Sequence, residues 1–382
     1  TPEALVAWLC AEAKQQAVTY AWEDLHWADP STLELLTLFL EQVPTTRVLA
    51  VLTFRPEFTP PWGAHSYLSQ ILLSRLSRAQ VGLMVEKVTG GKTLPAEVVQ
   101  QIVNKTDGVP LFVEELTKTV LESVESLGSG GRLAQSSLQL GIPATLHDAL
   151  MARLDRLGSA KEIAQVGATI GREFAYELLQ AVSSLTDETL HQGLRQLVEA
   201  ELVYQSGRPP QATYLFKHAL IQDTAYQSLL KSRRQQLHQQ VAQVLVKKFP
   251  QTVETHPELA AHHYTEAGSI EQALPYWQQA GELAIKRLAL KEAIAHLNQG
   301  MVRLGTRPPS SERDGQELDL RIRLGTAWSA LKGQGVPEVW TNVHPALGLA
   351  KSLDRREALV PIYWGLWANV DVQGRIAEAL NW

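Results

Sequence analysis

The stretch WEDLHWADPST, residues 22–32, decides how the N-terminal part of the chain folds. It begins where VTYAW, residues 18–22, ends, and that β-branched and aromatic run predicts a strand with acidic residues at its tip. Asp29 and Pro30 predict the start of a helix, because aspartate caps helices and proline suits the first turn. A second apolar run, VLAVLTF at 48–54, predicts another strand. Strand, helix and strand of these lengths predict a parallel sheet.

Three charged residues follow the two predicted strands: Glu23 and Asp24 after the first, and Arg55 after the second. Parallel sheets bind ligands beyond the carboxyl ends of their strands, so we expect these residues at a ligand site. In nucleotide-hydrolysing sites, one such carboxylate holds Mg²⁺, usually through water, and another orients the attacking water. An isolated acidic pair is more often a solvated turn, but the full context of residues 22–32 favours the site.

Residues 22–32 closely resemble the Walker B block of the STAND class of AAA-like signal-transduction P-loop ATPases. More narrowly, the chain is similar to the ATPase and tetratricopeptide region of bacterial proteins whose N-terminal portion is often a class III adenylate/guanylate cyclase. The resemblance implies ATP or ADP and Mg²⁺ as ligands. LAVLTFRPEF at 49–58 resembles the sensor 1 strand, which implies that Arg55 approaches the γ-phosphate. Taken alone, Arg55 suits a charged strand end equally well.

Two later blocks extend the resemblance. KTDGVPLFVEEL at 105–116 contains a Gly-x-Pro signature at Gly108 and Pro110, which implies that Pro110 packs near the adenine. YLFKHALIQDTAYQSLL at 214–230 resembles a winged-helix block, in which related ATPases place a histidine, here His218, against the β-phosphate of ADP. From the residues alone, Gly-Val-Pro is an ordinary helix-breaking turn, and a lone histidine on a helix is more often packed or capping.

Two features depart from the family pattern. The family has a Gly-rich loop that cradles the phosphates and precedes Walker B, and this loop is missing from the sequence. GKT at 91–93 resembles its tail, but Glu86 stands where the loop needs glycine, so we interpret these residues as a surface turn. The acids also stand in the order Glu23, Asp24, the reverse of the usual one. Position alone assigns Glu23 to Mg²⁺ and Asp24 to the water, and the shorter arm of Asp24 suggests slow hydrolysis.

The predicted fold class is α/β followed by mostly α. Residues 1–125 are expected to form the C-terminal part of a P-loop NTPase domain with a helical lid, and 126–140 a Gly/Ser-rich linker. Residues 141–250 are expected to form a winged-helix-like domain and 251–382 a truncated tetratricopeptide-like solenoid, because small residues recur at helix-packing positions. The expected elements between 68 and 248 are helices over 68–125 with breaks at 89–93 and 107–110, helices 144–157, 160–170, 174–182 and 187–200, a hairpin around 203–215, and a long helix from about 219.

Composition and charge exclude several function classes. The net charge of −5 provides no basic field for binding nucleic acid. Cys10 is the only cysteine, which excludes a disulfide framework and suits a reducing compartment. No stretch approaches the roughly 20 apolar residues of a membrane-spanning helix, so we expect a cytoplasmic protein without membrane contact. We expect no metal site at His262 and His263, since adjacent helical residues point about 100° apart. Both chain ends are interpreted as cuts through a longer gene product.

Together these inferences predict a regulatory ATP-binding or ATPase and protein-interaction segment of a multidomain bacterial signalling protein. The nucleotide state would act as a switch for a covalently linked output domain, such as a class III cyclase, while the repeats bind a protein or peptide ligand. Without the phosphate-cradling loop, the segment alone is expected to be inactive as an ATPase. The alternatives are an interaction scaffold with a degenerate ATPase and the regulatory segment of a transcription activator.

Overall fold

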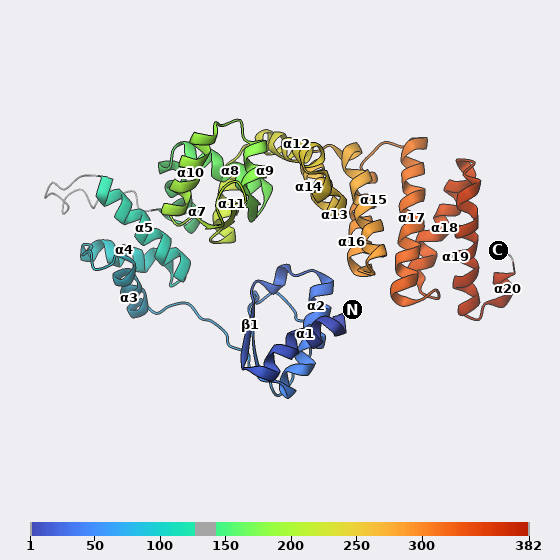
Figure 1. The fold of residues 1–382 in the computed structure, drawn as a ribbon, viewed down its shortest axis with the longest axis horizontal. Coiled ribbons are helices and arrows are strands. Elements are labelled where there is room, and N and C mark those ends of the chain that lie inside the picture. Colours follow the sequence, from blue (N-terminus) through green and yellow to red (C-terminus); the bar gives the residue numbers. More distant parts are fainter. Residues whose placement is uncertain (1, 127–142, 381–382) are drawn as a thin grey trace. The chain divides into compact units, whose positions relative to one another are not determined.

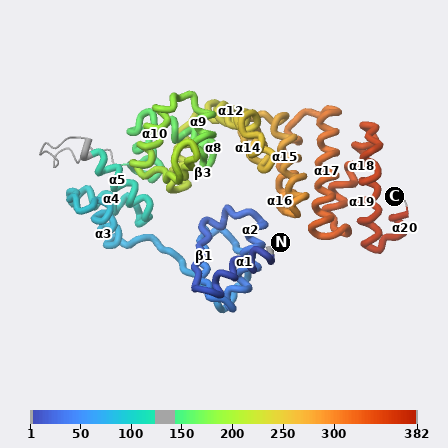
Figure 2. The backbone as a smooth tube through the Cα atoms, in the orientation of Figure 1, coloured from blue at the N-terminus to red at the C-terminus, as the bar shows by residue number. Residues whose placement is uncertain are grey.

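The computed structural model describes residues 2–126 and 143–380, and Figures 1 and 2 show their path. The predicted linker at 126–140 lies almost entirely outside the described residues. The chain divides into two compact units. The first unit contains residues 1–70, 252–265 and 269–382, and the second unit contains residues 71–251 and 266–268.

The N-terminal part of the first unit has the predicted strand, helix, strand order. β1 pairs with β2 in parallel, with Val18 opposite Val48 and Trp22 opposite Leu52. The Trp22 ring packs against Phe39 of α2, with the ring centroids 5.1 Å apart, so this helix covers one face of the strand pair. The elements are α1 (Pro2–Gln15), β1 (Val18–Trp22), η1 (Leu25–Trp27), α2 (Pro30–Gln42), η2 (Val43–Thr45) and β2 (Val48–Leu52).

The helices predicted from residue 68 begin later than expected. The fully described segment 68–77 contains no helix, and the first helix starts at Arg78. Ser77 caps this helix in a reciprocal capping box with Gln80, a local signal that outweighs the helix-forming leucines before it. The helix breaks predicted at 89–93 and 107–110 are confirmed. The helices are α3 (Arg78–Val88), α4 (Ala96–Thr106) and α5 (Pro110–Ser126), which share one apolar core.

The rest of the second unit combines helices with a small antiparallel sheet of strand order β3-β5-β4. The predicted hairpin around 203–215 is present as β4 and β5. Two expectations are wrong. The helix expected at 174–182 begins only at Tyr176, because residues 173–175 pair with β5 as a strand, and the long helix expected from 219 is broken after Gln227. The elements are α7 (Leu146–Arg156), α8 (Ser159–Ile170), β3 (Glu173–Ala175), α9 (Tyr176–Val182), α10 (Asp187–Glu199), β4 (Val203–Ser206), β5 (Thr213–Phe216), α11 (Ala219–Gln227) and α12 (Lys231–Lys248).

The C-terminal part of the first unit is a stack of helices, each packed on the next from α15 to α19 (Figure 1). Glycines allow this close approach, because an added Cβ at Gly281 would lie 2.5 Å from the Leu297 side chain and one at Gly325 would lie 2.3 Å from Val343. The predicted packing role of small residues is therefore confirmed at these crossings. The elements are α13 (Pro250–Thr255), α14 (Pro257–Glu266), α15 (Ile270–Lys286), α16 (Leu290–Leu304), α17 (Ser311–Lys332), α18 (Pro337–Ser352), η3 (Arg356–Ala358), α19 (Leu359–Val372) and α20 (Ile376–Ala379). Within residues 2–126 and 143–380, no helix is long and apolar enough to cross a membrane.

Candidate functional site

The parallel register of β1 and β2 brings the candidate acids and arginine to one edge of the sheet. Trp22 and Leu52 are paired at the carboxyl ends of the two strands, so Glu23 and Asp24 leave the sheet beside the residues that lead to Arg55. The Arg55 guanidinium carbon lies 5.5 Å from the centroid of the Trp27 ring, an arrangement in which the ring face attracts the positive charge. Three of the six predicted site residues are thus gathered by two short strands.

The backbone after β2 holds the acidic turn in place through Thr53. The Thr53 amide donates to the Trp22 carbonyl at 2.9 Å, and the Thr53 carbonyl accepts from the Leu25 amide at 2.9 Å. The Thr53 hydroxyl oxygen also accepts a hydrogen bond from the Asp24 amide at 3.1 Å. Sequence reasoning missed Thr53, although a hydroxyl residue that directly follows an apolar strand is a signal that was available.

The conformation of Asp24 gives a physical reason for the reversed order of the acids. Its φ of 57° and ψ of 40° lie in the left-handed region, which costs energy for most residues. Aspartate and asparagine enter this region several-fold more often than other non-glycine residues, whereas glutamate has no such advantage. The turn therefore favours aspartate in the second position and leaves the exposed Glu23 as the longer and more adaptable arm.

His26 and Asp29 complete this end of the sheet. Both ring nitrogens of His26 are buried and have no hydrogen-bond partner among the residues that the structure describes. The Asp29 carboxylate caps α2 as predicted, accepting from the Thr32 amide at 2.8 Å and from the Thr32 hydroxyl at 2.6 Å. Burial acts to raise the pKa of Asp29, but the hydrogen bonds from Thr32 outweigh it and leave the pKa below its usual value.

The donor set at the strand ends fits Mg²⁺, which prefers carboxylate oxygens and retained waters. Phosphate cradling is a separate requirement, and it needs a glycine-rich loop between a strand and a helix. The Gly-Lys-Thr sequence at 91–93 follows α3 instead of a strand, with Gly90 and Gly91 in a turn at positive φ. No strand leads into a glycine-rich loop in the part of the chain that the structure describes.

Gly108 has a demonstrable packing role in the second unit. Its φ is +69°, and an added Cβ would lie only 2.2 Å from the carbonyl oxygen of Leu76. The Leu76 amide donates to the Gly108 carbonyl at 2.8 Å, so the two backbones run in direct contact. Pro110 is the first residue of α5, where its missing N–H carries no penalty. The adenine contact predicted for this turn stays a prediction.

His218 stands immediately before α11, at the N-cap position, and its side chain makes no capping hydrogen bond. Its Nε2 atom is buried and has no hydrogen-bond partner within the described ranges. Burial lowers the pKa of His218, and the positive charge of Lys217 lowers it further. The ring is therefore favoured in the neutral state, in which one nitrogen remains an acceptor. His218, Gly108 and Pro110 all belong to the second unit.

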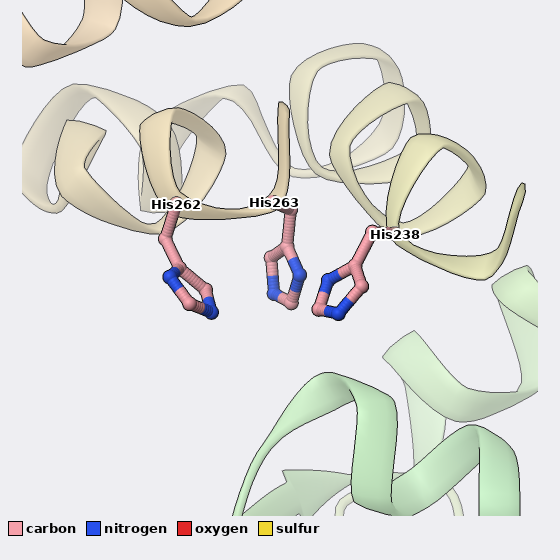
Figure 3. Close-up of side chains that lie close together, drawn as sticks. All are labelled: His238, His262 and His263. Atoms are coloured by element: carbon pink, nitrogen blue, oxygen red, sulfur yellow. The ribbon is translucent and has the colours of Figure 1, made fainter. Parts of the chain in front are cut away.

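The paired histidines of α14 differ in their surroundings. His262 is exposed, whereas His263 is buried, and the ring centroids are 5.2 Å apart in an edge-to-face arrangement. Figure 3 shows these two side chains extending from α14 and His238 extending from α12. Within the second unit, Nε2 of His238 lies 2.9 Å from the hydroxyl of Tyr226.

Comparison with known proteins gives a limited likeness. No family model matches the chain. An uncharacterized protein of Rhizobium meliloti (strain 1021) is 26% identical over 371 residues, which cover 95% of this chain and 36% of the relative. The chain thus spans about a third of that relative's length. A crystal structure of a signal transduction ATPase with numerous domains (STAND) and a tetratricopeptide repeat sensor, from Pyrococcus horikoshii, is 11% identical, with a TM-score of 0.46 over 99% of this chain and 56% of the other.

Proposed function

We propose that this chain is the regulatory ATP-binding and protein-interaction segment of a STAND-type signalling ATPase. The observation that carries the proposal is the position of Glu23, Asp24 and Arg55 at the carboxyl ends of two adjacent parallel strands. Negative and positive side chains at this edge suit a metal ion and a phosphate, and ligands of parallel sheets bind at this edge. The motif of residues 22–32, which resembles Walker B, supports the same assignment.

In this proposal the two acids have different tasks. Asp24 is held by the Thr53 hydroxyl and by its left-handed backbone, so its carboxylate suits the orientation of an attacking water, which requires a fixed geometry. Glu23 is exposed and adaptable, which suits contact with Mg²⁺ through water. Mg²⁺, when bound, supplies positive charge that offsets the charge of the phosphates. Arg55 supplies a second positive charge for the γ-phosphate.

The nucleotide contacts of Gly108, Pro110 and His218, which belong to the second unit, are proposed from the resemblance of their sequence blocks alone. The buried Nε2 of His218 has no hydrogen-bond partner among the described residues, and a ring that carries a proton on this nitrogen donates to a phosphate oxygen. Residues 143–248 supply the helices and antiparallel strands of a winged-helix-like domain in this assignment. The nucleotide state then acts as the switch for a covalently linked output domain, of which a class III cyclase is our candidate.

Nucleotide binding by two versions of the protein tests the proposal. The 382-residue chain is compared with a longer version taken from the full gene product, by titration calorimetry with Mg-ATP and Mg-ADP. We expect negligible affinity in the chain and micromolar affinity in the longer version. Glu23→Gln and Asp24→Asn should abolish hydrolysis there, whereas Glu41→Gln, an exposed acid on α2, should not. Tight ATP binding by the 382-residue chain would contradict our placement of the phosphate-binding loop.

A second candidate function, an interaction scaffold, is favoured by one observation on the helical stack. Trp364 is 60% exposed and Trp367 is 37% exposed on α19, and their ring centroids lie 5.2 Å apart. Exposed paired tryptophans are typical of protein-binding surfaces, since they bury a large apolar area at low entropic cost. The scaffold alone would bind its protein or peptide ligand equally well with and without nucleotide.

A further inference from the structure

Apart from α12, the second unit contains two groups of elements, which are separated in the sequence by residues 127–142, outside the described residues. One group is α3–α5, and the other is α7–α11 with the three-stranded sheet. Helix α5 belongs to the first group, yet its charged side chains contact the second group in two separate clusters. The distances and burial of these clusters indicate how firmly the two groups are joined.

The first cluster is buried and centres on Arg153 of α7. Arg153 forms an ion pair with Glu115 of α5, and these side chains are 3% and 0% exposed. The Arg153 Nε also lies 3.2 Å from Glu122, and another guanidinium nitrogen donates to the Ala200 carbonyl. Arg156, one turn further along α7, reaches Glu122 at 2.8 Å. The Oε1 atom of Glu115 is buried without a hydrogen-bond partner among the described residues, so removal of Arg153 would leave the Glu115 charge uncompensated.

The second cluster shares four charges between α5 and the strand region. Lys217, which follows β5, lies 3.0 Å from Glu114 of α5 and 3.3 Å from Glu201. Lys118 of α5 lies 2.8 Å from Glu114 and also pairs with Glu201. Burial acts to raise the pKa of Glu114, but the hydrogen bonds from Lys118 and Lys217 outweigh it and lower the pKa to about 2. Each lysine is thus bound by one carboxylate from each group.

Apolar contacts run through the same junction. Ala149 of α7 is fully buried and belongs to the core formed by α3, α4 and α5. Leu146 of α7 packs against that core and also against the core of the α7–α11 group. One helix therefore contributes to both cores, and the junction combines this apolar burial with one buried ion pair, Arg153 with Glu115, and a partly exposed cluster around Lys217.

We propose that α3–α5 and α7–α11 are locked by α5 into one rigid body, which moves as a whole and does not open between the two groups. Opening the junction would return the charges of both clusters to water, so the ion pairs add little to the lock, which rests on the apolar packing of α7 against both cores. A body of this kind transmits a displacement from one end to the other without an intermediate hinge.

The lock has a consequence that rests on the proposed function. Gly108 and Pro110 lie at the start of α5, and His218 lies directly after Lys217 of the second cluster. If nucleotide contacts any of these residues, the lock requires the others to move with it. A change of position caused by nucleotide binding would then affect α3–α5 and α7–α11 together.

Native-state amide hydrogen exchange of the 382-residue chain under increasing urea tests the lock without any nucleotide. We expect peptides from α5 and from α8 to converge on the same opening free energy and the same urea dependence, because one cooperative unit opens as a whole. Distinct urea dependences for the two groups in the unaltered protein would overturn the proposal.

Substitutions then ask whether the two clusters cause this behaviour. Arg153→Met should raise exchange in α3–α5 by on the order of a hundredfold or more. Because this variant leaves the buried Glu115 without its partner, the double variant Glu115→Leu with Arg153→Met, which removes both charges, should recover the stability of the fold. Lys217→Met gives a milder variant with the same direction of change. Lys161→Met, which removes a more exposed pair with Asp155, serves as the control.

The outcomes separate the lock from the proposed function. If Arg153→Met changes exchange in neither group, the buried cluster does not act on the junction and the proposal fails, whereas an equal rise in both groups supports a single cooperative unit. In the longer version of the protein, Mg-ADP should change exchange in α5 and in α11 at the same concentration. Absence of nucleotide binding would contradict the proposed function and leave the urea experiment to decide on the lock.

Discussion

Replacement of Gly108 by alanine is the sharpest test of how the second unit is built. The residue has a φ of +69°, and a Cβ there would lie 2.2 Å from the Leu76 carbonyl oxygen and 3.0 Å from the Leu76 nitrogen. A left-handed conformation costs alanine about 1–2 kcal/mol. The contact is with backbone, so the segment at Leu76 must also shift, and loss of its 2.8 Å hydrogen bond to Gly108 costs about 1 kcal/mol more. We expect Gly108→Ala to lower the unfolding free energy by about 2–4 kcal/mol.

The matched control is Gly82→Ala in the middle of α3. An added Cβ at Gly82 has no atom within 4 Å, and the helical backbone is relaxed, so alanine should stabilise the second unit by about 1 kcal/mol. Urea titration followed by far-ultraviolet circular dichroism measures both variants. All ten tryptophans lie outside residues 71–251, so their fluorescence reports on the first unit and should not change. A loss of less than 1 kcal/mol in Gly108→Ala would refute the packing argument and leave ligand contact as the reason for glycine.

Three further predictions concern charge, the acidic turn and the order of the acids. Glu114→Gln should lower the free energy of unfolding by about 1–2 kcal/mol at pH 7 and should have almost no effect near pH 2. The pKa of Glu114 is about 2 in the folded protein and near 4.5 when unfolded, so its stabilising contribution is fully present above pH 4.5 and is lost as the pH falls through about 2. Urea midpoints measured across this pH range test the prediction. Thr53→Val should raise amide exchange at Asp24 about fivefold and Thr53→Ser should restore it, whereas Thr19→Val on the exposed side of β1 should change nothing at that amide. The double variant Glu23→Asp with Asp24→Glu, which swaps the two acids, should be about 1 kcal/mol less stable than the Asp24→Asn variant. Equal melting temperatures of the two variants would contradict the role of the left-handed turn.

Local signals were enough to predict the elements that surround the candidate site. The apolar runs at 18–22 and 48–54 form the two expected strands, and Asp29 caps the helix between them. These features depend on alternating burial and on hydrogen bonds to residues three positions away, which a sequence displays directly. The expected edge that carries Glu23, Asp24 and Arg55 followed from the same short-range pattern.

Pairing between distant segments explains the errors. The helix expected at 174–182 begins two residues later, because residues 173–175 pair as a strand with β5, some forty residues further along the chain. The extended segment before α3 was expected to be helical, and its backbone instead runs beside Gly108, thirty residues away. Long-range contacts of this kind leave no mark in the local periodicity.

The sequence by itself determined the two strands and the capped helix beside the candidate site, the charge types at the strand ends and the small residues that let the C-terminal helices approach. Only the tertiary structure decided that the Thr53 hydroxyl binds the Asp24 amide, and that this acid has a left-handed backbone. It also decided that Arg153 and Glu115, residues 38 positions apart, form the buried centre of the junction between two groups of helices. The physical reason is that helix capping and burial periodicity are properties of neighbouring residues. The pairing of a buried charge depends on which distant segment the fold brings to it.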